Sequence, residues 1–151
     1  MSSRADIAVE YFNAGYNCSQ AVFAAFADKY GIDKNTALRL ASSFGGGIGR
    51  MREVCGAASG MFLVAGLETG AVDGSDRDGK AENYRVVREL ADAFKAQTGS
   101  IICRELLGLD DAAKKAETHV PEARTPAYYA KRPCAEMVRL AAEILTEKFG
   151  E

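Results

Sequence analysis

The stretch from Gly45 to Gly70 constrains the fold more than any other part of the chain. It reads GGGIGRMREVCGAASGMFLVAGLETG, and its residues 61–67 carry no polar side chain. A helix that is apolar on every side must lie inside the protein. We therefore predict a buried central helix from about Val54 to Gly70, with Cys55 at its amino end.

Three glycines lie inside this predicted helix: Gly56, Gly60 and Gly66. Glycine in a helix interior costs about 1 kcal/mol relative to alanine. Together with Ala57, these residues give the helix a slim profile. We therefore expect a neighbouring backbone or a bound group to approach it very closely.

The rest of the chain divides into further helical segments. Side chains that cap helices precede the expected amino ends, and glycines follow most of the expected carboxyl ends. Pro133 takes the first position of the last helix, and the other helices have as expected caps Ser3, Asn17, Asp33, Ser100 and either Asp110 or Asp111. No segment alternates as a strand does. We predict an all-α fold in which residues 1–151 form a single domain, a bundle of six to eight helices around the buried central helix.

Two segments carry more particular expectations. A long amphipathic helix after residue 81 should turn five side chains inward: Tyr84, Val87, Leu90, Ala91 and Phe94. The segment from His119 to Arg132 contains two prolines and no helical period, which predicts a loop.

Composition narrows the class of protein. The chain is 48% apolar and 26% charged with a net charge of −2, and no lysine or arginine cluster dominates a segment, which argues against a nucleic-acid binder. There is no apolar signal-peptide core, and no run approaches the roughly 18 residues of a membrane span. We therefore expect a cytoplasmic protein, where cysteines serve catalysis, redox sensing or metal binding more often than structural disulfides. Because the chain has one histidine, a histidine-based metal centre is not expected.

Four cysteines are the candidate catalytic groups: Cys18, Cys55, Cys103 and Cys134. Their intervals of 37, 48 and 31 residues exclude the Cys-x-x-Cys spacing of a zinc ribbon or a thioredoxin-like site. Each falls in or next to the first turn of an expected helix, where free backbone N–H groups and the helix dipole favour the thiolate. Arginines at positions 52, 104 and 132 lie within three residues of three of the cysteines and act in the same direction.

These thiols are expected to meet. Cys18 and Cys134 lie on the apolar faces of their helices, so four thiols from four helix tips could share one pocket. We predict that at least two lie close enough to bond and that one has a lowered pKa. Cys55 should be that one, because Arg50 and Arg52 precede it and support its thiolate. The alternative is that the cysteines fill the core without chemistry, since buried free cysteine is a common core residue.

The glycine turn at residues 45–49 has two interpretations. Its backbone N–H groups could cradle an anion next to Arg50 and Arg52, or the turn could serve close packing alone. Close packing is favoured, because no strand precedes the turn and it completes neither a dinucleotide fingerprint nor a P-loop. His119 is expected to be a surface residue.

The surroundings of the cysteines resemble a known family. The chain reads YNCSQAV at the first cysteine, VCGAASG before a glycine-punctuated apolar helix at the second, and ICRELLG and RPCAEMV at the others. From about Ala14 to Phe149 it resembles the C_GCAxxG_C_C family, a group of small prokaryotic proteins described as redox-active. Val54 stands where the family's name writes a glycine, and the central motif is formed by Cys55, Gly56, Ala57 and Gly60.

The resemblance implies a cysteine-based redox role without an established substrate, in a family whose members tend to be encoded near transporters. A similar module accompanies some multihaem cytochromes, which keeps an iron–sulfur site open. The chain has no Cys-x-x-Cys-His motif, so it binds no c-type haem itself.

Three hypotheses follow. The first is a cytoplasmic thiol–disulfide redox protein, a candidate oxidoreductase, in which Cys55 attacks a disulfide or an oxidant and a second cysteine resolves the intermediate. The second is a binding module in which the four thiolates of Cys18, Cys55, Cys103 and Cys134 hold zinc or an iron–sulfur cluster. The third is a structural or interaction protein. The redox partner, which the resemblance associates with transporters, stays open, as do the cysteine pairing and the oligomeric state.

Overall fold

The chain forms nine α-helices and one 3₁₀ turn over the part that the computed structural model describes, residues 2–151. The 3₁₀ turn is η1 (Asp28–Tyr30), and the α-helices are α1 (Arg4–Asn13), α2 (Cys18–Ala27), α3 (Lys34–Ser42), α4 (Gly56–Thr69), α5 (Arg77–Thr98), α6 (Cys103–Leu106), α7 (Asp111–Lys115), α8 (Pro126–Lys131) and α9 (Cys134–Phe149). Residues 2–151 contain no strand, only one isolated antiparallel bridge between Val54 and Ile102. The all-α prediction is therefore confirmed. Within the same residues, no helix is both long enough and apolar enough to cross a membrane.

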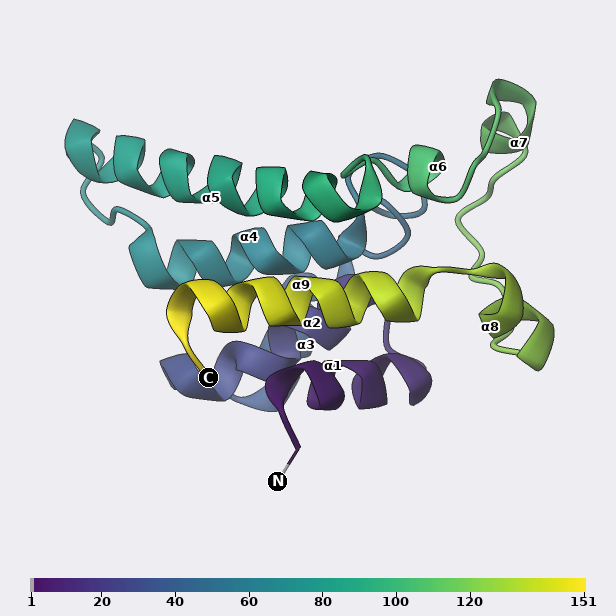
Figure 1. Cartoon of the computed structure of the whole chain (residues 1–151), viewed down its shortest axis with the longest axis horizontal. Helices are drawn as coiled ribbons and strands as arrows, with labels where there is room; N and C mark the ends of the chain where they lie inside the picture. Colours follow the sequence, from purple (N-terminus) through teal and green to yellow (C-terminus); the bar gives the residue numbers. More distant parts are fainter. Residues whose placement is uncertain (1) are drawn as a thin grey trace.

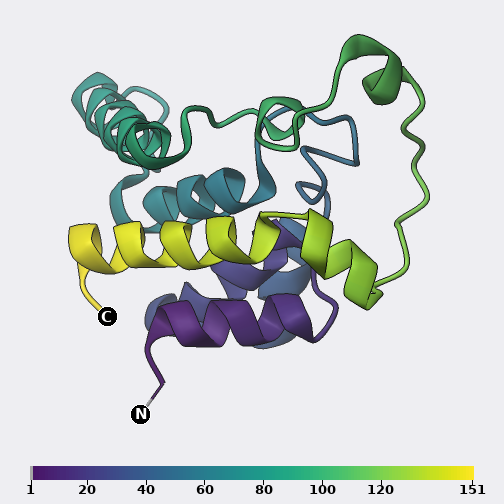
Figure 2. The same cartoon turned by 45° about the vertical axis from the view of Figure 1, so that its right-hand side comes forward.

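The bundle is built around three mutually packed helices. α2, α4 and α9 contact one another, α1 lies on α2 and α9, α3 lies on α2, and α5 lies on α4 and α9 (Figure 1, Figure 2). Their apolar faces meet in one core, whose largest fully buried side chains include Phe12, Phe23, Phe26, Met61, Leu90, Phe94 and Leu145. The amino ends of α4 and α9 lie at the same end of the bundle as α6, α7 and α8, on the right of Figure 1. This end carries the candidate site.

The predicted central helix is α4, and its burial is uneven along its length. Residues 56–61 are buried, as are Val64 and Ala65, whereas Gly66 and Leu67 are exposed. The prediction of a helix buried on every side is therefore confirmed for its first half and wrong for its last turns, where one face has no neighbouring helix over it.

Two of the motif glycines bring α4 very close to α2. A Cβ atom at position 60 would lie 2.8 Å from Cβ of Val22, and one at position 56 would lie 3.1 Å from Cβ of Cys18. Only glycine allows this approach, as the sequence predicts for Gly56 and Gly60. The same prediction is wrong for Gly66, where a Cβ atom would meet nothing within 4 Å.

Replacing Gly60 with alanine is expected to lower the free energy of unfolding by about 1–3 kcal/mol, because the new methyl group overpacks against α2. Gly66→Ala is the matched control in the same helix. It adds the same methyl group in open space and should stabilise the protein by about 0.4–1 kcal/mol, because it restricts the unfolded chain. Urea unfolding of both variants measures the difference. Equal stability would mean that α2 moves aside without cost.

One predicted loop contains a helix. The segment 119–132 was expected to be a loop, but α8 forms within it, which takes the helix count above the predicted eight. Thr125 accepts a hydrogen bond from the N–H of Tyr128, and Pro126 takes the first helical position. A six-residue helix is too short to show a hydrophobic period, so its cap and proline were the available signal.

The core-facing stripe of α5 differs from the prediction at its amino end. Leu90, Ala91 and Phe94 are buried as expected, but Tyr84 is 62% exposed and Val86 is buried. The stripe that meets the core runs through positions 86, 90 and 94, and Tyr84 lies to one side of it.

Candidate functional site

The four cysteines stand at four helix amino ends, as the sequence predicts. Cys18, Cys103 and Cys134 are the first residues of α2, α6 and α9. Cys55 is the N-cap residue of α4. All four are free thiols, and all four line one cavity of about 60 Å³. A cavity of this size holds a few water molecules or one small chemical group.

The antiparallel β-bridge between Val54 and Ile102 joins the segments that precede α4 and α6, and it brings Cys55 close to Cys103. The N–H of Cys55 donates to the carbonyl of Ile101 at 2.7 Å. The N–H of Cys103 donates to the carbonyl of Glu53 at 2.6 Å. Two helix starts far apart in the sequence are thus fixed side by side. A single bridge has no alternating pattern, so the sequence gives no signal for it.

The first and last cysteines shift each other's pKa. Their interaction is the largest cause of both shifts: it raises the pKa of Cys18 well above its usual value and lowers the pKa of Cys134 to about 7. Burial opposes the ionisation of Cys134, while the positive charges of nearby arginines favour it: Arg132, Arg52 and Arg124. At pH 7, about half of the molecules therefore carry the Cys134 thiolate beside a protonated Cys18.

Cys55 is not the thiol with the lowered pKa. Burial raises the pKa of Cys55 to about 12, although the N–H groups of Ala58 and Ala57 at the start of α4 donate toward its sulfur. The N–H groups at the amino end of α4 lower the pKa of Cys55, as the sequence predicts, but burial raises it by more. Burial also raises the pKa of Cys103, against an opposing hydrogen bond from Arg52. The pKa of Cys55 is thus raised and not lowered as expected.

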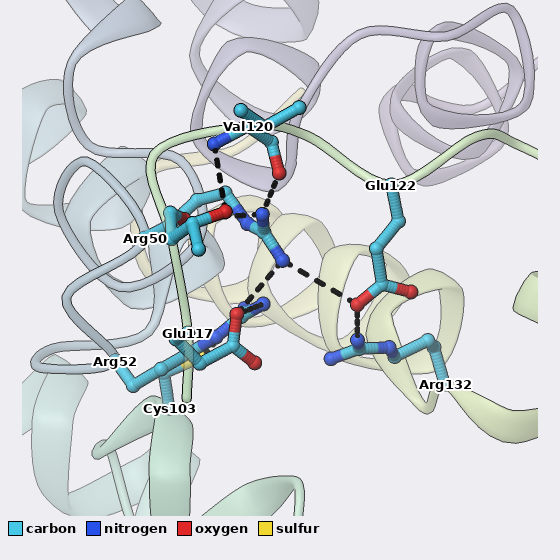
Figure 3. A network of polar contacts seen from close by, with 8 residues as sticks. Arg50, Arg52, Cys103, Glu117, Val120, Glu122 and Arg132 are labelled. Atoms are coloured by element: carbon cyan, nitrogen blue, oxygen red, sulfur yellow. Dashed lines mark hydrogen bonds and ion pairs between the residues drawn. The ribbon is translucent and has the colours of Figure 1, made fainter. Parts of the chain in front are cut away.

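Arg50 and Arg52, which were expected to support Cys55, point elsewhere. The side chain of Arg52 is buried, with its Nη1 atom 3.6 Å from Sγ of Cys103. Its Nη2 atom pairs with Glu117 at 3.2 Å, and Arg50 pairs with the same carboxylate oxygen at 2.8 Å (Figure 3). Arg52 therefore supports Cys103, and Arg50 fastens the loop that follows α7.

The same network reaches α9. Glu122 accepts hydrogen bonds from Arg50, at 3.4 Å, and from Arg132 (Figure 3). Arg132 immediately precedes Pro133 and Cys134. The loop between α7 and α8 is thus tied by two glutamates to the glycine turn and to the start of α9.

The glycine turn is organised by its own backbone. The N–H groups of residues 48–53 all donate to carbonyl groups of residues 43–48, so they are not free to bind an anion. Ile48, Arg50 and Arg52 have φ angles of +69°, +64° and +60°. A β-branched residue in this region is a genuine outlier, and such strain gathers at functional sites. The favoured interpretation, close packing, agrees with this geometry.

With the cysteines located, comparison with known proteins decides the family. The family described as "Putative redox-active protein (C_GCAxxG_C_C)" matches residues 16–148, which include all four cysteines. The chain belongs to the C_GCAxxG_C_C family. No curated protein and no solved structure matches it.

In this member of the family, the central motif is a packing element as well as a cysteine site. The family's name writes a glycine before the cysteine, and this chain carries Gly56 directly after Cys55. Gly56 and Gly60 face α2, and Ala57 is fully buried. The motif therefore holds the helix end that bears Cys55 against the helix end that bears Cys18.

A larger groove adjoins the cysteine cavity. It has a volume of about 410 Å³, and five residues line both spaces: Asn17, Gly46, Arg52, Arg124 and Tyr128. His119, expected at the surface, lies on the wall of the groove. The sequence analysis missed Arg124 and Glu117, because neither belongs to a motif and both act through contacts with distant segments.

A single metal ion does not fit the thiols as they are placed. Among residues 2–151, no three histidine, cysteine, aspartate or glutamate side chains are arranged to hold one ion. Arg52 and Arg124 line the cavity, and their positive charges disfavour a cation there. Among the described residues, the geometry therefore gives a single ion such as zinc no ligand set.

Proposed function

We propose that this member of the C_GCAxxG_C_C family is a thiol–disulfide redox protein in which Cys134 attacks a disulfide and Cys18 completes the exchange. The observation that carries the proposal is the single cavity lined by four free thiols, in which Cys18 and Cys134 shift each other's pKa. Membership of a family described as redox-active supports it. The packing of α2 against α9 holds the pair together.

The proposed exchange has two steps. The Cys134 thiolate attacks one sulfur of the substrate disulfide, forms a mixed disulfide and expels the other half as a thiolate, which takes the proton of Cys18. The Cys18 thiolate then attacks the Cys134 sulfur and expels the second half, which takes a proton from solvent. Two protein thiols are oxidised to one disulfide, and one substrate disulfide is reduced to two thiols.

In this proposal, Cys55 and Cys103 do not take part in the first exchange. Burial keeps Cys55 and Cys103 protonated at neutral pH. Arg52, beside the Cys103 sulfur, opposes this effect of burial in part. Cys103 is therefore the thiol that we propose attacks the Cys18–Cys134 disulfide in a later exchange, which forms a bond to one of these sulfurs and releases the other as a thiol. We place this chemistry in the cytoplasm, where free thiols persist, with a redox partner that regenerates the pair.

Oxidation with 2-hydroxyethyl disulfide, a small neutral disulfide, tests the proposal. We expect the loss of two free thiols per chain and a Cys18–Cys134 disulfide in peptide maps. Cys18→Ser should stop at a mixed disulfide on Cys134, and Cys134→Ser should leave Cys18 unmodified. Cys55→Ser is the control and should still form the pair. A disulfide between other cysteines, or unchanged oxidation of the Cys134→Ser variant, would contradict the proposal.

A further inference from the structure

A groove large enough for a small ligand lies beside the cavity that Cys134 lines. The inner cavity, at about 60 Å³, admits only a small group, whereas the groove, at about 410 Å³, has the volume of a small-ligand site. The five shared lining residues place the two spaces next to each other. A small molecule in the groove therefore lies beside the cavity that holds the four thiols, which is too small to admit a folded polypeptide.

The charges around the groove do not cancel. Arg50 and Arg52 share one oxygen of Glu117, and Arg50 and Arg132 share one oxygen of Glu122. Arg124 has no ion pair among residues 2–151; it donates instead to carbonyl groups of α1 and the turn after it. Three arginines and one glutamate line the groove itself, which leaves an excess of positive charge: Arg50, Arg52, Arg124 and Glu122.

Two of these arginines, Arg52 and Arg124, have features that suit the binding of an anion. The side chain of Arg52 is 7% exposed, lines both spaces, and keeps its Nε atom without a hydrogen-bond partner. A buried guanidinium with an unsatisfied donor is costly unless a ligand completes it. Arg124 is held over the rings of Phe12 and Tyr128, with its Cζ atom 4.4 Å and 5.1 Å from their centroids. Its position is therefore set before a ligand arrives.

We propose that the groove binds the carboxylate end of a small anionic disulfide, at Arg52 and Arg124, and delivers its sulfur to Cys134. This inference rests on the proposed thiol–disulfide exchange and names its substrate class. A guanidinium presents N–H groups in a fork that matches a carboxylate, which makes a carboxylate-bearing disulfide the fitting ligand. The exchange itself is balanced as described above, with the anionic disulfide as the oxidant.

Three small disulfides of similar size and different charge test the inference. They are 3,3′-dithiodipropionate, which is anionic, 2-hydroxyethyl disulfide, which is neutral, and cystamine, which is cationic. Each rate of mixed-disulfide formation at Cys134 is divided by the rate of free 2-mercaptoethanol with the same disulfide. We expect the anionic disulfide to exceed the neutral one by on the order of tenfold, and the advantage to shrink at high salt.

Variants separate binding from the reactivity of the thiol. In Arg124→Met, the ratio of the anionic rate to the neutral rate should fall toward one. A change in the pKa of Cys134 slows both disulfides equally, so it leaves that ratio unchanged. Arg88→Met, an exposed arginine on α5, is the matched control and should keep the wild-type ratio.

A ligand that cannot react distinguishes this inference from the proposed function. Suberate has the two carboxylates of 3,3′-dithiodipropionate with carbon in place of sulfur, and 1,8-octanediol is its neutral counterpart. Calorimetric titration should show binding of suberate alone, weakened in Arg124→Met. If suberate binds but the thiols do not exchange, the groove is an anion site and the proposed redox function fails. If the Cys18–Cys134 disulfide forms with no preference for anions and no suberate binding, the inference about the groove is overturned.

Discussion

At pH 7, Cys134 is expected to react with iodoacetamide several orders of magnitude faster than Cys55. A thiol with a pKa of about 7 is about half thiolate at that pH, whereas one with a pKa of about 12 is thiolate in roughly one molecule in 10⁵. Exposure acts in the same direction, since Cys134 is half-buried and Cys55 is buried. The reactivity of Cys134 should fall as the pH drops below 7, because its thiolate is then protonated.

The hydrogen bond from Cys18 is the largest cause of the lowered pKa, so its removal should be visible. Cys18→Ala deletes the donor and should raise the pKa of Cys134, which slows its alkylation at pH 6–7. Cys18→Ser is the matched control, because its hydroxyl group can still donate to the Cys134 sulfur. Arg132 keeps its charge in both variants, so the comparison isolates the hydrogen bond.

Peptide mapping by mass spectrometry follows the four thiols separately across a range of pH. A sigmoidal rate with its midpoint near 7 at Cys134, lost in Cys18→Ala and kept in Cys18→Ser, is the expected result. Faster alkylation of Cys55 than of Cys134 would show that helix-end stabilisation outweighs burial after all. An identical response of the two Cys18 variants would mean that the arginines, and not the thiol pair, set the pKa.

The placement of the cysteines could be predicted because the signals for it are local. Asn17 caps α2 through the N–H of Gln20, which puts Cys18 at the first helical position. Glycines within the helix, Gly56 and Gly60, predict a close contact with another helix, and the structure shows this contact with α2. Caps and small residues act within one turn of the chain, so a sequence displays them directly.

The ranking of the thiols could not be predicted, because it depends on distant parts of the chain. Arg52 precedes Cys55 by three residues, yet its guanidinium lies against Cys103, which the β-bridge between Val54 and Ile102 brings next to it. The pKa of Cys134 depends on Cys18, from the other end of the sequence. Burial, which decides the state of Cys55, is a property of the assembled bundle.

The second large effect is a loss of stability, which we expect when Gly47 in the glycine turn is replaced. This residue has a φ angle of +73°, and a Cβ atom there would lie 2.7 Å from Cα of Arg52 and 2.7 Å from Cβ of Cys103. Gly47→Ala is therefore expected to destabilise the protein by roughly 2–5 kcal/mol, from about 1–2 kcal/mol of left-handed strain and about 1–3 kcal/mol of overpacking. Urea unfolding measures this loss.

Gly49→Ala separates the two causes in the same turn. Gly49 has a φ angle of +55°, but a Cβ atom there would meet nothing within 4 Å, so only the strain of about 1–2 kcal/mol should appear. The two variants should also differ at the site. Gly47→Ala must displace either Arg52 or Cys103, so it should raise the alkylation rate of Cys103 by opening the cavity, whereas Gly49→Ala should leave that rate unchanged. Equal losses of stability in the two variants would show that the turn yields freely, and that the contact between Gly47 and Cys103 does not hold the cavity closed.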